Sequence, residues 1–208
     1  MRTLKCFLFA AIVGLVFLAP AVGQAQTPTA ALKKINADVD RLLKKKVPKG
    51  SAADKKVKAD IKALAGSLLD YDELSQQALK RHWGELSAAQ RSEFTKVFRE
   101  LIERNYVKQI RTGVDYGITY KEEKVDGQKA RVKTVIRTKR KGRVADTVVD
   151  YRMLRAAGKW RVWDIITDED EYSSLVMNYR SEFNKIWAKD GFEGIMKKIR
   201  SKLAEGDE

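Results

Sequence analysis

Side chains able to carry acid–base or metal chemistry are few in this chain of 208 residues. His82 is the single histidine and Cys6 the single cysteine. A histidine metal cluster therefore cannot be built, and any Ser-His-Asp triad would have to use His82. The sequence contains no G-x-S-x-G motif, P-loop or dinucleotide fingerprint. We therefore expect no catalytic residue, no metal and no cofactor, and for His82 a packing or capping role.

Carboxylates are the remaining candidates for chemistry. Asp150 and Asp164 lie on two predicted strands, where either can act as a general base, and this keeps an enzymatic interpretation open. The acidic run Asp168 to Glu171 lacks the glycine and the terminal glutamate spacing of an EF-hand loop. Because acidic residues are favoured at helix N-termini, we interpret this run as the solvated start of a helix.

The N-terminus has the pattern of a secretory signal peptide. Arg2 and Lys5 precede the apolar run Cys6 to Leu18, and small residues suited to cleavage follow as far as Ala25. We predict a cleaved signal peptide at residues 1–25, a mature chain of residues 26–208 and a periplasmic location; the alternative is an uncleaved membrane anchor. Cleavage would remove the only cysteine and would leave no disulfide or thiolate chemistry.

The predicted mature chain is strongly basic. Cleavage removes two of the 42 basic residues and none of the 28 acidic ones, so the formal net charge falls from +14 to +12. Such a charge usually suggests nucleic-acid binding, but an exported protein does not meet nucleic acid in its normal setting. We expect the positive field to attract anionic lipid headgroups or acidic partner surfaces instead.

Helical periodicity organises the first half of the mature chain. Thr29 to Lys46 carries a stripe of Leu32, Ile35, Val39 and Leu42, and Ser51 caps a second helix that buries Val57, Ile61, Leu64 and Leu68. Asp70 is the expected N-cap of a third helix, which we predict to run as far as Gly84.

A capping box starts the next helix. Ser87 and Gln90 can exchange side-chain and backbone hydrogen bonds, so a helix is predicted from Ala88. Its apolar stripe comprises Phe94, Val97, Phe98, Leu101, Ile102, Tyr106 and Ile110.

After Ile110 the spacing of apolar residues changes from that of helices to that of strands. Two alternating segments flank Asp126-Gly127, a hairpin signal, and turns at Lys141-Gly142 and Ala157-Gly158 lead into strands Val144 to Arg155 and Lys159 to Ile166. Two further helical stripes follow, separated at Gly191. The fold class predicted is therefore α+β, one domain with a four-stranded antiparallel meander packed on one face by N-terminal and C-terminal helices.

Apolar surface is abundant on both the strands and the helices. The stripes can fill one another as a compact core, or they can stand apart and enclose a cavity, and periodicity alone does not decide between these arrangements.

Two groups of residues resemble a known family in order and spacing. The first group comprises Asp70, Arg81, His82, Trp83, Gln90, Arg91, Phe94, Phe98, Leu101 and Tyr106. The second comprises Trp160, Asp164, Ile165, Asn178, Tyr179, Arg180, Phe183, Gly191, Phe192, Glu193, Gly194 and Ile195. Together they are similar to the MlaC, or toluene-tolerance, family of periplasmic phospholipid carriers, which usually has glycine where Lys80 stands and a shorter, less acidic connection than Thr167 to Ser174.

This resemblance implies a non-enzymatic carrier that holds a diacyl phospholipid in an apolar pocket between sheet and helices. It also implies two partners: an inner-membrane ABC transporter complex with an MCE-domain protein, and an outer-membrane lipoprotein and porin complex. We infer the lipid-contacting residues from the apolar stripes. They are Phe98, Leu101, Ile102, Tyr106, Ile118, Tyr120, Val132, Ile136, Val149, Tyr151, Met153, Val176, Tyr179 and Phe183.

Positive charge crowds the predicted hairpin at Gly142. Arg137, Lys139, Arg140, Lys141 and Arg143 repel one another unless they are solvated or meet an acidic surface, so we predict that this hairpin docks partners. Two other interpretations remain: an α+β enzyme that uses Asp150 or Asp164 as base, and a basic adaptor without a ligand cavity.

Overall fold

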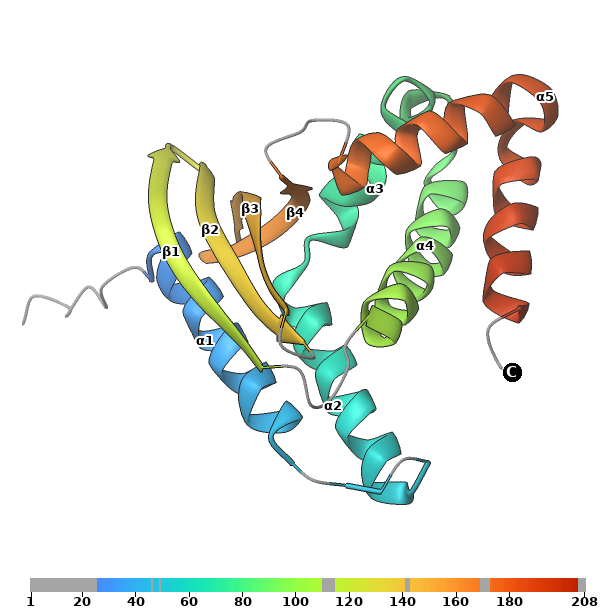
Figure 1. Ribbon diagram of the computed structural model, residues 1–208. Helices are drawn as coiled ribbons and strands as arrows, with labels where there is room; N and C mark the ends of the chain where they lie inside the picture. Colours follow the sequence, from blue (N-terminus) through green and yellow to red (C-terminus); the bar gives the residue numbers. More distant parts are fainter. Residues whose placement is uncertain are drawn as a thin grey trace, which may run out of the picture.

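The computed structural model describes residues 26–45, 47–48, 50–109, 115–140, 143–168 and 173–205, without the side chains of 106–109, 115, 140 and 143. The predicted signal peptide lies outside these residues. In these described residues, five α-helices, a short 3-10 helix and four strands follow one another in the order expected for an α+β protein, which confirms the predicted fold class (Figure 1).

The first two helices both begin at a capping hydroxyl, and that of the second, Ser51, was predicted. Helix α1 (Pro28–Leu43) starts after Thr27, whose side chain accepts a hydrogen bond from the Ala30 N–H. Helix α2 (Ala52–Leu68) starts after Ser51, which accepts from the Asp54 N–H in the same way. Each cap satisfies one of the backbone donors that a helix leaves free at its first turn.

Helix α3 (Tyr71–Leu79) begins at the predicted cap Asp70 but ends earlier than expected. The chain continues as the 3-10 helix η1 (Lys80–Glu85), so the prediction of one helix as far as Gly84 is wrong. The cause is local, because Lys80 has a φ of 38°, which no α-helical residue adopts.

Helix α4 (Ala88–Gln109) starts at the predicted capping box. The Gln90 N–H donates to the Ser87 hydroxyl at 3.3 Å, and the Ser87 N–H donates to the Gln90 side-chain oxygen at 2.9 Å. This reciprocal pair confirms the prediction of a helix from Ala88.

The four strands form the predicted meander, in the order β1-β2-β3-β4. Their bounds are β1 Asp115–Asp126, β2 Lys129–Arg140, β3 Arg143–Ala156 and β4 Lys159–Thr167. The first turn consists of Gly127 and Gln128, one residue later than predicted, whereas Ala157 and Gly158 form the last turn as expected. Both residues of that last turn have positive φ, as a two-residue hairpin of this kind requires.

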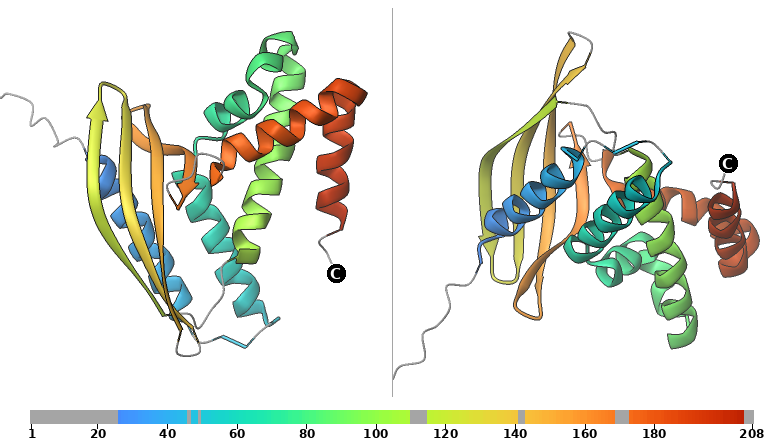
Figure 2. Two further views of the ribbon diagram at one scale, coloured as in Figure 1. Left: turned by 45° about the horizontal axis from the view of Figure 1, so that its top comes forward. Right: turned by 90° about the horizontal axis from the view of Figure 1, so that it is seen from below.

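Helix α1 lies across one face of the sheet (Figures 1 and 2). It is tied to β1 by two hydrogen bonds, from the Asn36 amide to the Tyr120 hydroxyl at 2.7 Å and from the Thr29 N–H to the Glu123 carboxylate at 2.7 Å. Helix α4 packs mainly against α2, α3 and α5. The N-terminal helix α1 therefore covers this face of the sheet.

Helix α5 (Leu175–Ala204) bends sharply at Gly191, which separates the two predicted helical segments (Figure 1). Gly191 has φ 61° and ψ −154°, a conformation that only glycine adopts without strain. The bend sets the last segment, with its buried residues Ile195, Met196 and Ile199, at a steep angle to the first.

Backbone strain at Lys80 provides a first test. Lys80→Gly should raise the free energy of unfolding by about 1 kcal/mol. Glycine removes the strain of the positive φ, and this gain exceeds the loss caused by the greater entropy of the unfolded chain. For a chain of this size that corresponds to a rise in Tm of about 2–4 °C, measured by thermal unfolding followed by circular dichroism.

The matched control is Lys80→Ala, which removes the same charge but keeps a Cβ atom at the strained position. It should not gain stability. Equal melting temperatures for the glycine and alanine variants would show that the backbone at this position is not strained.

Candidate functional site

The predicted residues on α4 and α5 form an aromatic cluster. The ring centroid of Phe98 lies 4.8 Å from that of Tyr179 and 5.4 Å from that of Phe183. Phe94 joins them at 5.2 Å from Phe98 and 5.6 Å from Phe183. Most of these pairs meet edge to face, the favoured arrangement of aromatic rings in a well-packed interior.

The hydroxyl at the rim of this cluster stays neutral. Tyr179 accepts a hydrogen bond from the Asn105 amide at 3.2 Å, and burial raises the pKa of its phenol above the ordinary value. Tyr179 can therefore border an apolar ligand without carrying a charge into it.

The predicted sheet residues form a second apolar surface. Val132 pairs with Tyr151 across β2 and β3, and Met153 lies further along the same face of β3. All three are buried, as is Val149. Residues two apart on a strand point to the same face, so this part of the prediction follows directly from the strand register.

Three predicted residues nearer the open edge of the sheet are only partly buried: Ile118, Tyr120 and Ile136. Ile118 and Ile136 are paired across β1 and β2, and the Tyr120 hydroxyl is bonded to α1. Burial raises the pKa of Tyr120, and the ammonium of Lys33 lies 5.1 Å from its ring. Helix α1 thus closes the side of the core that the sequence left unassigned.

The structure brings nearly all of the predicted residues into one contiguous core. Nine belong to its buried part: Phe98, Leu101, Ile102, Val132, Val149, Tyr151, Met153, Val176 and Phe183. Tyr120, Ile136 and Tyr179 pack against it, and the side chain of Tyr106 lies outside the described residues. Leu32 of α1 and Val162 of β4 also belong to this core; Leu32 lies on the predicted stripe of the first helix, whereas Val162 was not singled out from the sequence.

A hollow of about 260 Å³ opens at the β1–β2 turn end of the sheet. Ala130 and Met153, both members of the core, line it together with Val125 and Trp163. Four cationic side chains stand around it: Lys124, Lys129, Arg131 and Arg152. An apolar floor with a basic rim suits an amphipathic ligand better than a wholly polar one.

The two carboxylates considered as catalytic bases have structural partners. Asp164 is almost fully buried and accepts hydrogen bonds from the Ser174 hydroxyl at 2.8 Å and the Val176 N–H at 3.1 Å. Asp150 is buried against Arg131, whose Nε donates to it at 2.9 Å. Asp164 therefore anchors the start of α5, and the buried Asp150 is paired with an exposed arginine.

His82 has the packing role expected for it. Its ring stacks on Trp187 at 4.2 Å, and its Nε2 accepts a hydrogen bond from the Arg81 Nε at 3.0 Å. Its Nδ1 lies 3.0 Å from the Glu85 carboxylate, so both ring nitrogens are engaged. Among the described residues no group of three potential ligands could hold a metal ion.

The predicted docking hairpin is described only in part. Arg137 donates to the Asp146 carboxylate at 2.7 and 2.6 Å, and this hydrogen-bonded ion pair lowers the pKa of Asp146. Lys139 is exposed, whereas the side chains of Arg140 and Arg143 and the whole of Lys141 lie outside the described residues. One of the five predicted cations is therefore partly neutralised within the sheet.

No helix in the described part of the chain is both long enough and apolar enough to span a membrane.

The fold is similar to that of a phospholipid-binding protein from Ralstonia solanacearum, solved in complex with a phospholipid. The TM-score is 0.65 at 19% sequence identity, and the match covers 89% of this chain and 100% of the other. A search of curated proteins found no match.

A comparison with family models shows the family of this chain. Residues 33–201 match the model described as MlaC protein, and this span takes in helices α2 to α4, all four strands and most of α1 and α5. With most of its length matched, the chain belongs to the MlaC family.

Proposed function

We propose that this protein is a periplasmic phospholipid carrier that receives a diacyl lipid at one membrane and delivers it at the other. The observation that supports this most is its membership of the MlaC family, a family of binding and transport proteins and not of enzymes. The similarity in fold to a protein solved with a phospholipid supports the same ligand class. Export by the signal peptide at residues 1–25 is part of the proposal.

The energetic need for such a carrier is large. Each methylene group withdrawn from water contributes about 0.8 kcal/mol, and a diacyl lipid has about thirty of them, so free lipid does not cross an aqueous gap at a useful rate. We assign the contacts with the acyl chains to the apolar residues of the sheet and of helices α4 and α5. Because these side chains pack against one another in the structure, lipid entry requires α1 or the helical layer to move away from the sheet.

The carboxylate interpretation is less well supported than the carrier. Asp164 accepts hydrogen bonds from the start of α5, and one oxygen of Asp150 accepts from Arg131, so both carboxylates already have structural partners. The proposed partners are an inner-membrane ABC transporter complex with an MCE-domain protein and an outer-membrane lipoprotein and porin complex.

The direct test is the lipid content of the native protein. The full chain, expressed with its signal peptide and purified without detergent, should release about one phospholipid per protein on extraction with organic solvent. Mass spectrometry identifies the lipid, and the intact protein mass shows whether residues 1–25 have been removed. A protein free of lipid would favour the adaptor or the enzyme over the carrier.

Val149 tests the assignment of the sheet surface. Val149→Arg should abolish lipid retention, because the charge of a guanidinium among the acyl chains would have no partner. If that surface can open to solvent, the delipidated variant should still unfold in a cooperative thermal transition. Val144→Arg is the matched control, since Val144 lies on the same strand but is 58% exposed.

Delipidated samples must be compared, because bound lipid stabilises the folded state by mass action. A Val149→Arg protein that folds and still carries lipid would exclude this surface from the binding site. Failure to fold, with a folded Val144→Arg control, would place Val149 in a permanently closed core.

The basic hairpin tests the docking proposal. Replacing Lys139, Arg140 and Lys141 with serine should weaken binding to anionic vesicles or to a partner complex and reduce its salt dependence, with lipid content unchanged. A control that removes three other exposed lysines, Lys189, Lys197 and Lys198 of α5, should bind as the wild type does. Equal losses in both variants would indicate a response to net charge and not to the hairpin.

A further inference from the structure

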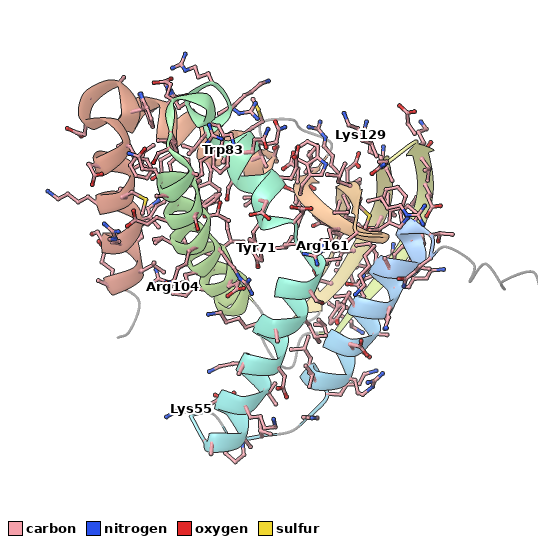
Figure 3. All side chains as sticks on the ribbon, turned by 180° about the vertical axis from the view of Figure 1, so that it is seen from behind. Lys55, Tyr71, Trp83, Arg104, Lys129 and Arg161 are labelled. Atoms are coloured by element: carbon pink, nitrogen blue, oxygen red, sulfur yellow. The ribbon has the colours of Figure 1, made fainter. Side chains whose placement is uncertain are left out.

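A second hollow lies beside the apolar core, between α4, the junction of α2 and α3, and β4. Its volume is about 460 Å³. The side chains that characterise it are the cations Arg91, Lys96, Arg99 and Arg161 and the aromatic residues Tyr71 and Trp83. Figure 3 shows Tyr71 and Arg161 close together at the centre of this side of the molecule, with Trp83 above them.

One face of α4 forms a wall of this pocket. Arg91, Thr95 and Arg99 follow one another at four-residue spacing, so they form a single row along the helix. Phe94 and Phe98 occupy the face that packs on α5. The same helix thus contributes one surface to the core and another to the basic pocket.

Cations outnumber carboxylates in the lining of this pocket, four to two. In the part of the chain that the structure describes, Arg91, Lys96 and Arg161 make no ion pair. Of the two carboxylates in the lining, Asp70 is occupied as the N-cap of α3, where it accepts from the Glu73 N–H at 3.0 Å, and Asp72 is exposed. Three unpaired cations in one concave site create a potential that attracts an anion.

Two of the guanidinium groups are already held in place. Arg91 donates from Nε to the Trp83 carbonyl at 2.9 Å and lies 5.5 Å from the Trp83 ring. Arg99 donates to the Glu103 carboxylate at 2.7 Å and lies 5.0 Å from the Tyr71 ring. Because these side chains are fixed before a ligand arrives, less conformational entropy is lost on binding.

Gly66 permits this close arrangement. A Cβ atom at this position would lie 3.1 Å from Nη2 of Arg99 and 3.3 Å from the Glu103 carboxylate. A Cβ atom there would require Arg99 and Glu103 to shift by a few tenths of an ångström. The glycine therefore allows α2 and α4 to approach each other behind the basic wall.

We propose that this pocket binds a phosphate group. A guanidinium binds an oxyanion through two parallel hydrogen bonds, and several cations match the charge of a phosphate better than that of a single carboxylate. The volume of the pocket leaves room for the glycerol or small headgroup that such a phosphate carries. The phosphate belongs either to the headgroup of an anionic phospholipid or to a soluble phosphate ester.

Binding of sn-glycerol 3-phosphate to the delipidated full chain, measured by isothermal titration calorimetry, tests the site. Arg161→Gln should weaken binding by at least about tenfold, since it removes a charged hydrogen-bond donor. Arg161→Lys keeps the charge but not the paired donors, so its affinity for sn-glycerol 3-phosphate should lie between those of the wild type and Arg161→Gln. Lys55→Gln is the control, because Lys55 lies on α2 eleven residues before Gly66, about 16 Å away along the helix (Figure 3).

Two comparisons identify the source of the phosphate. If it is the lipid headgroup, protein loaded with phosphatidylglycerol should no longer bind sn-glycerol 3-phosphate, and the ³¹P resonance of the bound lipid should shift in Arg161→Gln. If it is a soluble ester, lipid-loaded protein should bind it as tightly as delipidated protein does. Only the first of these outcomes rests on the proposed carrier function.

No binding by the wild type, or equal weakening in Arg161→Gln and Lys55→Gln, would overturn the proposal. Thermal unfolding of each variant excludes misfolding as the cause, and Arg161→Lys gives a second measurement if the glutamine variant does not fold. The lipid content of the wild type is measured separately. Absence of lipid would contradict the carrier, whereas absence of glycerophosphate binding by the wild type would contradict the phosphate site alone.

Discussion

The outer edge of β4 is where the sheet and the helical layer are joined, and the rest of the structure depends on this joint. The Asp70 N–H donates to the Val162 carbonyl at 2.8 Å, which fixes the start of α3 beside the strand. Further along the strand, the Asp164 carboxylate accepts hydrogen bonds from the Ser174 hydroxyl and the Val176 N–H, and these two bonds fix the start of α5. A buried carboxylate is stable only when such donors surround it, so Asp164 and the start of α5 specify each other's position. Both helices then leave the edge in directions that enclose the core.

This joint also explains why the carboxylate of Asp164 is not available for chemistry. A general base needs a free lone pair directed at a substrate proton, and Asp164 offers its oxygens to Ser174, Val176 and the Ile165 N–H. The helix N-terminus adds a favourable electrostatic interaction with the same carboxylate. An acidic residue that looks catalytic in the sequence is thus a structural cap shared by a strand and a helix.

Helix α4 separates two environments of opposite character. Its aromatic face packs on α5 in a cluster of rings whose centroids lie 4.8 to 5.6 Å apart, and its basic face lines the pocket that also contains Arg161. Aromatic packing of this density fixes the rotation of the helix about its axis, and this rotation determines which cations face the pocket. The apolar core and the basic pocket are therefore coupled through one rigid element.

Local patterns in the sequence determined much of this fold. The caps at Ser51, Asp70 and Ser87, the four strands of the meander and the break at Gly191 are all set by interactions within a few residues, so each could be predicted without knowing the rest. The core residues of β2 and β3 followed from the alternation of strands for the same reason. The break after Leu79 was missed because no local signal marks the positive φ of Lys80.

Contacts between distant segments were decided only by the tertiary structure. Periodicity shows that a stripe is buried but not against what, so the covering of the sheet by α1 and the packing of α4 on α2, α3 and α5 could not be predicted. Arg91 and Arg161 are 70 residues apart in the sequence and line the same pocket. Their proximity depends on how α4 is placed relative to β4. Residue type and spacing act over a few residues, whereas the choice of partner surface depends on shape and burial across the whole molecule.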